Sequence, residues 1–221
     1  MSKQIKQFAV IGLGRFGGSV CRELHSLGHE VLAIDMHLVR VEEFVQYSTH
    51  AIQGNSTDEM FLKSIGIRNF DHVIVAIGEN IQDSVLTTLS LKEFGISAVW
   101  VKAQNVYHQK VLEKIGADRV IHPEVEMGIR IAQSMSSDLL LDYINLSDEY
   151  SIIEIRATLP IHNRSLLDLN VRVKFGITIL AINGKYNMNV SPSPSDIIFE
   201  GDILIAMGLN NDLKRFEDKM F

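Results

Sequence analysis

The sequence has few of the features that mark secreted, membrane or nucleic-acid-binding proteins. Its 221 residues include a single cysteine, Cys21, which cannot form a disulfide within the chain and fits a reducing compartment. No apolar run approaches the roughly 20 residues needed to cross a bilayer, and the first residues lead into a strand-like run instead of a signal peptide. The 27 acidic residues exceed the 21 lysines and arginines, which disfavours a general role in nucleic-acid binding. These absences predict a soluble cytoplasmic protein.

The composition that remains is that of an ordinary globular protein, with 46% hydrophobic and 22% charged residues. In the first half, short runs rich in valine and isoleucine alternate with longer amphipathic stretches, a pattern typical of a parallel sheet with crossover helices. The predicted strands are residues 8–11, 31–34, 50–53, 73–77, 98–101 and 119–122. We therefore predict an α/β fold with a Rossmann-type, doubly wound parallel sheet.

The pattern of apolar residues changes in the second half of the sequence. Residues 124–141 are predicted to form one long crossover helix that starts at Pro123, and short β-type runs follow it. Asn183-Gly184-Lys185 is typical of a hairpin turn between two of these runs. We predict a nucleotide-binding domain over residues 1–145 and a small α+β domain over 146–221. A domain of about 75 residues is only marginally stable alone, so we expect it to dimerise or to pack on a partner.

A glycine-rich motif follows the first predicted strand. Gly12 would make a tight turn, Gly14 would let the backbone approach a phosphate, and Gly17 would let a helix pack closely on the strand. Asp35 ends the second predicted strand, 18 residues after Gly17, where a carboxylate accepts hydrogen bonds from ribose hydroxyls. Met36 follows, so no arginine stands directly after Asp35 to favour NADP. The motif predicts an adenosine ligand; the alternative is a structural turn with an unrelated surface aspartate.

Other polar residues near the predicted strand ends allow two interpretations each. Arg15 could contact the extra charge of a triphosphate, or it could be a solvated residue in a helix's first turn. The run Asn55-Ser56-Thr57 could touch base or ribose, or it could cap the next helix.

Two acidic residues also allow two interpretations each. Glu79 follows the fourth predicted strand and Glu124 follows Pro123, so both fit the acidic first turn of a helix. A carboxylate near a nucleotide's phosphates could instead hold a hard divalent cation through oxygen.

The sequence offers no catalytic set. Tyr107 and Lys110 have the wrong spacing for the Tyr-x-x-x-Lys dyad of one dehydrogenase class, and no HExxH motif or cysteine cluster is present. We therefore expect a protein that is not an enzyme. The rival interpretations are an NAD-dependent oxidoreductase with an unrecognised second domain, and an NAD(H)-sensing or other ligand-sensing module.

Several segments together resemble the RCK family of TrkA-N and TrkA-C domains, and within it the cytosolic regulatory subunits of Ktr-type bacterial potassium uptake systems. The segments are residues 8–18, 69–78, 101–105, 114–118 and 122–124 in the first half, and 167–172 and 201–205 in the second. The resemblance implies a Rossmann domain that binds ATP or ADP, with NAD(H) in some relatives. It also implies dimers that assemble into an octameric ring beneath an integral membrane potassium-translocating subunit, which places the chain on the inner face of the cell membrane through its partner.

The resemblance also assigns residues. Arg15 would reach a γ-phosphate across the dimer, Glu124 would hold Mg²⁺ or Ca²⁺ shared with ATP, and a cyclic di-AMP effector would lie between two copies of the small domain. The implied nucleotide contacts are Gly12, Gly14, Arg15, Phe16, Gly17, Asp35, Met36, Asn55, Ser56, Thr57, Ile77, Gly78, Glu79, Lys102 and Glu124. The implied cyclic di-AMP contacts are Asn170, Val171, Arg172, Ile177, Thr178 and Pro192.

Overall fold

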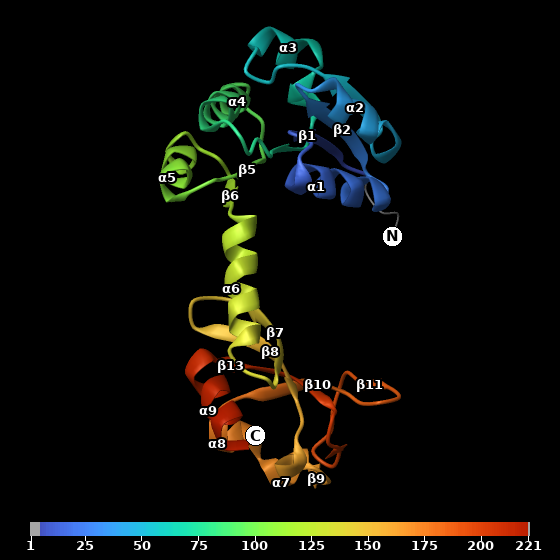
Figure 1. Cartoon of the computed structure of the whole chain (residues 1–221), viewed down its shortest axis with the longest axis vertical. Coiled ribbons are helices and arrows are strands. Elements are labelled where there is room, and N and C mark those ends of the chain that lie inside the picture. The colour runs from blue at the N-terminus through green and yellow to red at the C-terminus, as the bar shows by residue number, and fades with distance from the viewer. Residues whose placement is uncertain (1–4, 221) are drawn as a thin grey trace. The chain divides into compact units, whose positions relative to one another are not determined.

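The computed structural model describes residues 5–220, and its chain divides into two compact units between Pro123 and Glu124 (Figure 1). Each unit is built around its own sheet, with two hydrophobic clusters in the first unit and one in the second.

The first unit contains a parallel sheet of six strands in the order β3-β2-β1-β4-β5-β6, which confirms the predicted doubly wound arrangement. The strands are β1 (Gln7–Ile11), β2 (Glu30–Asp35), β3 (His50–Gln53), β4 (His72–Val75), β5 (Val99–Lys102) and β6 (Arg119–Ile121). The helices between them are α1 (Arg15–Ser26), α2 (Leu38–Phe44), α3 (Glu59–Ser64), α4 (Ile81–Glu93) and α5 (Val106–Lys114), with short 3₁₀ turns at Val45–Tyr47 and Ile67–Asn69. The strand order changes direction between β1 and β4, and ligands bind at the strand ends beside such a point.

Alternate residues of each strand face opposite layers of helices. In β1, Val10 belongs to a core that includes Cys21 of α1 and Phe44 of α2. Its neighbours Ala9 and Ile11 belong to a second core with leucines of α3, α4 and α5. Both faces of β1 are therefore buried, which is why it reads as a continuous apolar run in the sequence.

The second unit contains an antiparallel sheet of five strands in the order β11-β10-β13-β8-β7. These strands are β7 (Leu140–Asn145), β8 (Tyr150–Arg156), β10 (Thr178–Asn183), β11 (Met188–Asn189) and β13 (Ile203–Leu209), and β9 (Arg164–Ser165) pairs separately with β12 (Ile197–Ile198). The helices are α6 (Pro123–Met135), α7 (Leu166–Leu169), α8 (Val171–Phe175) and α9 (Asn210–Met220), with a 3₁₀ turn at Leu159–Ile161. The predicted hairpin turn is confirmed, because Gly184 N–H donates to the Asn187 carbonyl between β10 and β11.

The predicted helix over residues 124–141 is too long. Helix α6 ends at Met135, and the chain then enters β7, which pairs with β8. The Ser136 hydroxyl donates to the Gln133 carbonyl and the Ser137 hydroxyl accepts from the Leu139 amide, so these side chains replace the helical bonds. The boundary predicted after residue 145 falls between two paired strands, and the division lies earlier, at Pro123 and Glu124.

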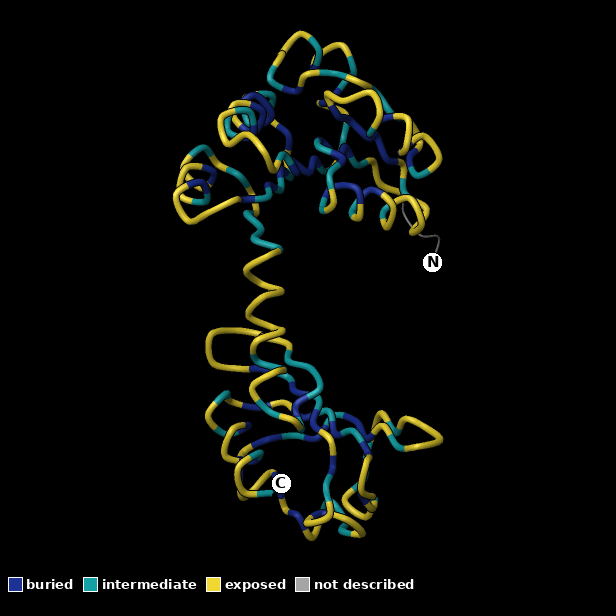
Figure 2. The backbone as a smooth tube through the Cα atoms, viewed as in Figure 1, coloured by how far each residue is buried: buried dark blue, intermediate teal, exposed yellow. Residues whose placement is uncertain are grey.

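Helix α6 differs from the others in its exposure. None of its residues is buried within the single chain, whereas the central strands β1, β2 and β4 are mostly buried (Figure 2). Within residues 5–220, no helix combines the length and the apolar character needed to cross a membrane.

The terminal helix α9 is held by one aromatic side chain. Phe216 is fully buried, and its ring lies 5.5 Å from that of Phe175 in a T-shaped contact. We expect Phe216→Ala to lower the free energy of unfolding of the second unit by about 3–5 kcal/mol, because it leaves a cavity in a close-packed core. Urea unfolding followed by far-UV circular dichroism would measure this. Phe199→Ala, at a ring that is half exposed, should cost much less, and an equal loss in both variants would contradict the assignment.

Candidate nucleotide-binding site

Two glycines of the motif are required by the packing of the loop. Gly12 has a φ of +94°, and a Cβ there would lie 2.9 Å from the backbone of Ala76, at the end of β4. A Cβ on Gly17 would lie 1.9 Å from the Gly12 carbonyl oxygen, so only glycine lets α1 approach the loop. The tight turn and the close helix packing expected of these glycines are both confirmed.

Gly14 has no such internal reason to be glycine. It adopts an ordinary extended conformation as the N-cap of α1, and a Cβ there would meet no atom of the described residues within 4 Å. Gly14 has no side chain, so the N-cap residue of α1 makes no side-chain hydrogen bond to the first amides of the helix. The position combines free space with the amides of a helix's first turn, which have no acceptor within the helix, and an anionic ligand at a helix N-terminus uses both.

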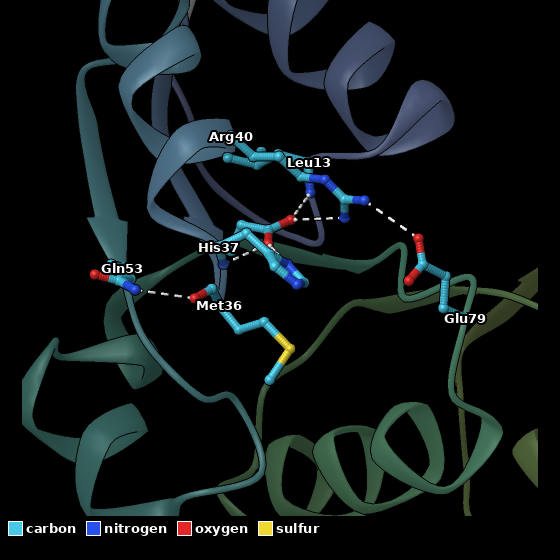
Figure 3. Close-up of polar contacts among 7 residues, drawn as sticks. Leu13, Met36, His37, Arg40, Gln53 and Glu79 are labelled. Atoms are coloured by element: carbon cyan, nitrogen blue, oxygen red, sulfur yellow. Dashed lines mark hydrogen bonds and ion pairs between the residues drawn. The ribbon is translucent and has the colours of Figure 1, made fainter.

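Asp35 lies beside this loop at the end of β2, and its side chain is only 4% exposed. Its Oδ2 accepts a hydrogen bond from the Leu13 amide at 2.8 Å, and its Oδ1 accepts one from the His37 amide at 2.9 Å (Figure 3). The His37 ring contacts the same Oδ1 at 3.0 Å. The carboxylate therefore ties the glycine loop to the end of β2.

These contacts decide the protonation state of Asp35. Burial alone would favour the neutral acid, but the hydrogen bonds from the His37 and Leu13 amides and the His37 ring, with the charge of Arg40, outweigh it. The pKa of Asp35 is consequently below its usual value. The side chain remains an anionic acceptor, the form that binds ribose hydroxyls.

An arginine that the sequence pattern did not predict lies at this carboxylate. Arg40 lies in α2, with its guanidinium 3.5 Å from Asp35 Oδ2 and 3.2 Å from Glu79 Oε1 (Figure 3). It follows Asp35 by five residues instead of directly, so the absence of an arginine beside Asp35 in the sequence did not mean its absence in space. The only signal was an arginine within the first turn of the helix after β2.

The residues Asn55-Ser56-Thr57, which follow β3, differ in their exposure. Ser56 is 6% exposed, and its hydroxyl hydrogen-bonds to Thr87 Oγ1 of α4 at 2.9 Å, so its side chain belongs to the interior. Asn55 is exposed, and its Oδ1 accepts bonds from both the amide and the hydroxyl of Thr57. Gln53, at the end of β3, donates a hydrogen bond from its Nε2 to the Met36 carbonyl at 3.0 Å.

The remaining predicted contacts in the first unit come from α1, β5 and the loop after β4. Lys102 Nζ lies 5.9 Å from the centre of the Phe16 ring. Ile77 is half-buried, and Gly78 is exposed with its carbonyl accepting from Gln104 Nε2 at 2.7 Å. Gln104 was not predicted, and it fixes the backbone beside Glu79.

The residues assigned to a triphosphate are exposed. Arg15 is the first residue of α1, and Glu124 lies in the first turn of α6 in the second unit. Among the described residues, no group of three or more histidine, cysteine, aspartate or glutamate side chains is placed to hold a metal ion.

The residues assigned to cyclic di-AMP divide into two groups. Val171 and Ile177 are 6% and 0% exposed and belong to the core of the second unit. Asn170, in a left-handed conformation between α7 and α8, and Arg172 are exposed, while Thr178 and Pro192 are half-buried.

Comparisons with known proteins identify the family. The TrkA-N domain model matches residues 8–123 and the TrkA-C domain model matches residues 150–220. The chain belongs to the TrkA-N/TrkA-C family. This TrkA-family chain is 60% identical over 214 residues to Ktr system potassium uptake protein A of Bacillus subtilis strain 168, which covers 97% of this chain and 96% of that protein. It is 53% identical over 215 residues to Ktr system potassium uptake protein C of the same organism, covering 97% of each.

Solved structures support the same fold for the TrkA-family chain. The crystal structure of the GsuK RCK domain matches with a TM-score of 0.69 and 15% identity, covering all of this chain and 48% of that one. A GsuK channel bound to NAD matches with a TM-score of 0.70 and 14% identity, covering 100% of this chain and 40% of that one. The expected RCK resemblance and the fold class are confirmed.

The contacts of Asp35 predict a pH-dependent stability. Asp35→Asn should lower the free energy of unfolding by about 1–3 kcal/mol at neutral pH, because buried amide donors then face an amide NH₂. Since the folded-state pKa of Asp35 is lowered, its contribution is complete above the unfolded carboxyl pKa of about 4 and is lost as the pH falls through the lower folded value. The difference between wild type and variant should therefore shrink in acid.

Urea unfolding between about pH 7 and pH 3 would measure this difference. Asp58→Asn is the control, because Asp58 caps α3 and asparagine caps a helix equally well. A penalty for Asp35→Asn that stays constant over the whole pH range would contradict the prediction.

Proposed function

We propose that this chain is the cytosolic, nucleotide-binding regulatory subunit of a Ktr-type potassium uptake system, and that it is not an enzyme. Its two relatives in Bacillus subtilis are Ktr system potassium uptake proteins, and the alignment spans nearly all of each chain. In this proposal it forms dimers that assemble into a ring of eight copies. The ring acts on an integral membrane subunit that translocates potassium, so the chain works at the inner face of the membrane.

The observation that carries nucleotide binding is the geometry at Gly14. The loop keeps space open at the N-terminus of α1, while the buried carboxylate of Asp35 stands beside the same loop as an acceptor. Amides of the loop and of α1 would bind phosphate, and Asp35 would bind the ribose. We propose ATP and ADP as the ligands, with NAD(H) as the alternative.

The switch between the two nucleotides requires contacts that only one of them makes. Arg15 is exposed at the first position of α1, so its guanidinium is free to reach the γ-phosphate of a nucleotide held by the neighbouring subunit. Glu124 would supply a carboxylate ligand to Mg²⁺ or Ca²⁺, which when bound neutralises phosphate charge. The loss of one charge-assisted contact on going from ATP to ADP is worth about 1.5–3 kcal/mol, enough to shift a ring between two shapes.

A second ligand, cyclic di-AMP, is proposed for the small domain. Arg172 is an exposed cation beside Asn170, whose left-handed conformation keeps its side chain at the surface between two short helices. An arginine and an amide at the cleft between two copies of the domain suit the phosphates and adenines of a dinucleotide. Val171 and Ile177 would shape the cleft from the core beneath it.

Calorimetric titration with ATP, ADP and NADH tests the nucleotide site, with Gly14→Ala as the decisive variant. We expect the wild-type protein to bind ATP and ADP, and Gly14→Ala to lose at least about tenfold in ADP affinity, because its methyl group occupies the open space. Tyr186→Ala, at a side chain that is 88% exposed in the second unit, is the control and should bind normally. Unchanged ADP binding in Gly14→Ala, with the fold intact, would contradict the proposal.

Arg15→Ala tests the switch. It should leave ADP affinity nearly unchanged and reduce the structural difference between the ATP-bound and ADP-bound assemblies, because Arg15 acts on the γ-phosphate alone. Small-angle scattering of the assembly with each nucleotide, together with native mass measurement of its size, would report the difference. Equal loss of affinity for both nucleotides would reject this role for Arg15.

A further inference from the structure

Arg40 joins two carboxylates that come from opposite sides of the first strand. Asp35 ends β2 and Glu79 follows β4, and both strands flank β1 in the sheet. The guanidinium of Arg40 contacts Asp35 at 3.5 Å and Glu79 at 3.2 Å (Figure 3). The chain of charges therefore passes over the end of β1, where the glycine loop begins.

The acceptor sites of Asp35 are already partly used. A carboxylate offers about four lone-pair directions. Two are taken by backbone amides, of Leu13 on Oδ2 and of His37 on Oδ1, which the loop holds in place. Of the remaining space, the His37 ring occupies the side of Oδ1, and the Arg40 guanidinium lies as an ion pair 3.5 Å from Oδ2. Ribose hydroxyls that approach Asp35 would meet these two side chains.

The contacts of Arg40 favour its displacement from Asp35. Its contact with Asp35, at 3.5 Å, is longer than an ordinary hydrogen bond, while its contact with Glu79 is at 3.2 Å. Glu79 is 81% exposed, so it can follow the arginine into solvent. Glu79 thus keeps Arg40 from closing fully on Asp35 and gives it a partner when it leaves.

We infer that Arg40 competes with the ribose hydroxyls of the nucleotide for Asp35, and that Glu79 sets the strength of this competition. The inference rests on the proposed adenine-nucleotide site and adds a residue pair that tunes its affinity. The effect is modest, because an exposed ion pair contributes only a small free energy, equivalent to about a two- to fivefold change in affinity.

Adenosine and 2′,3′-dideoxyadenosine separate this effect from phosphate electrostatics. Both are uncharged, and only adenosine has the two hydroxyls. We expect Arg40→Met to tighten adenosine binding about two- to fivefold and Glu79→Gln to weaken it by a similar factor, with no change for dideoxyadenosine. In the Arg40→Met background, Glu79→Gln should have no effect, because Glu79 acts only through Arg40.

The affinities can be measured by competition against ADP in a calorimeter. Arg22→Met is the matched control, because Arg22 pairs with Glu43 of α2 at 3.0 Å and should not alter the preference for adenosine over dideoxyadenosine. Weaker adenosine binding in Arg40→Met, or changes of the same sign in both single variants, would overturn the inference. Failure of the wild-type protein to bind ADP at all would instead overturn the proposed function.

Discussion

The buried carboxylate of Asp35 is the interaction on which the rest of the first unit's site depends. A charge that is only 4% exposed is costly to bury unless donors surround it, and here the Leu13 and His37 amides do so. Since Leu13 lies between Gly12 and Gly14, the same bond fixes the turn that aims the start of α1 at the strand ends. The position of the helix amides is thus set by an electrostatic requirement at the neighbouring strand, and the close approach of Gly17 completes it.

This arrangement makes one group serve both the fold and the ligand. The two backbone amides belong to the loop and to the end of β2, so they fix Asp35 independently of the side chains around it. The side chains of His37 and Arg40 occupy what remains of its acceptor capacity. In the competition inferred above, ribose hydroxyls would replace these two side chains at the carboxylate. The buried charge would then keep partners both with and without a nucleotide, at some cost in affinity.

The sequence predicted the features that depend on residues close together in the chain, and it did not predict contacts between distant segments. Gly12, Gly17 and Asp35 were predictable, because the turn, the helix approach and the strand end are local features with a fixed spacing. Arg40 with Glu79, and Ser56 with Thr87, were not, because each pair joins segments 39 and 31 residues apart that meet only once the strand order is set. The end of α6 was also missed, because the apolar pattern of residues 124–141 continues through Ser136 and Ser137, whose hydroxyls end the helix.

Helix α6 gives a physical reason for the self-association in the proposed function. Val125 and Ile129 lie one turn apart on one side of the helix, Met127 and Ile131 lie on another, and all four are at least half exposed in the single chain. A helix that is apolar on more than one side is a buried helix, so its stability requires a covering surface. A second copy of the chain would supply one in a symmetric assembly. In the proposed assembly, α6 would then be the element that joins two subunits, and Glu124 lies in its first turn.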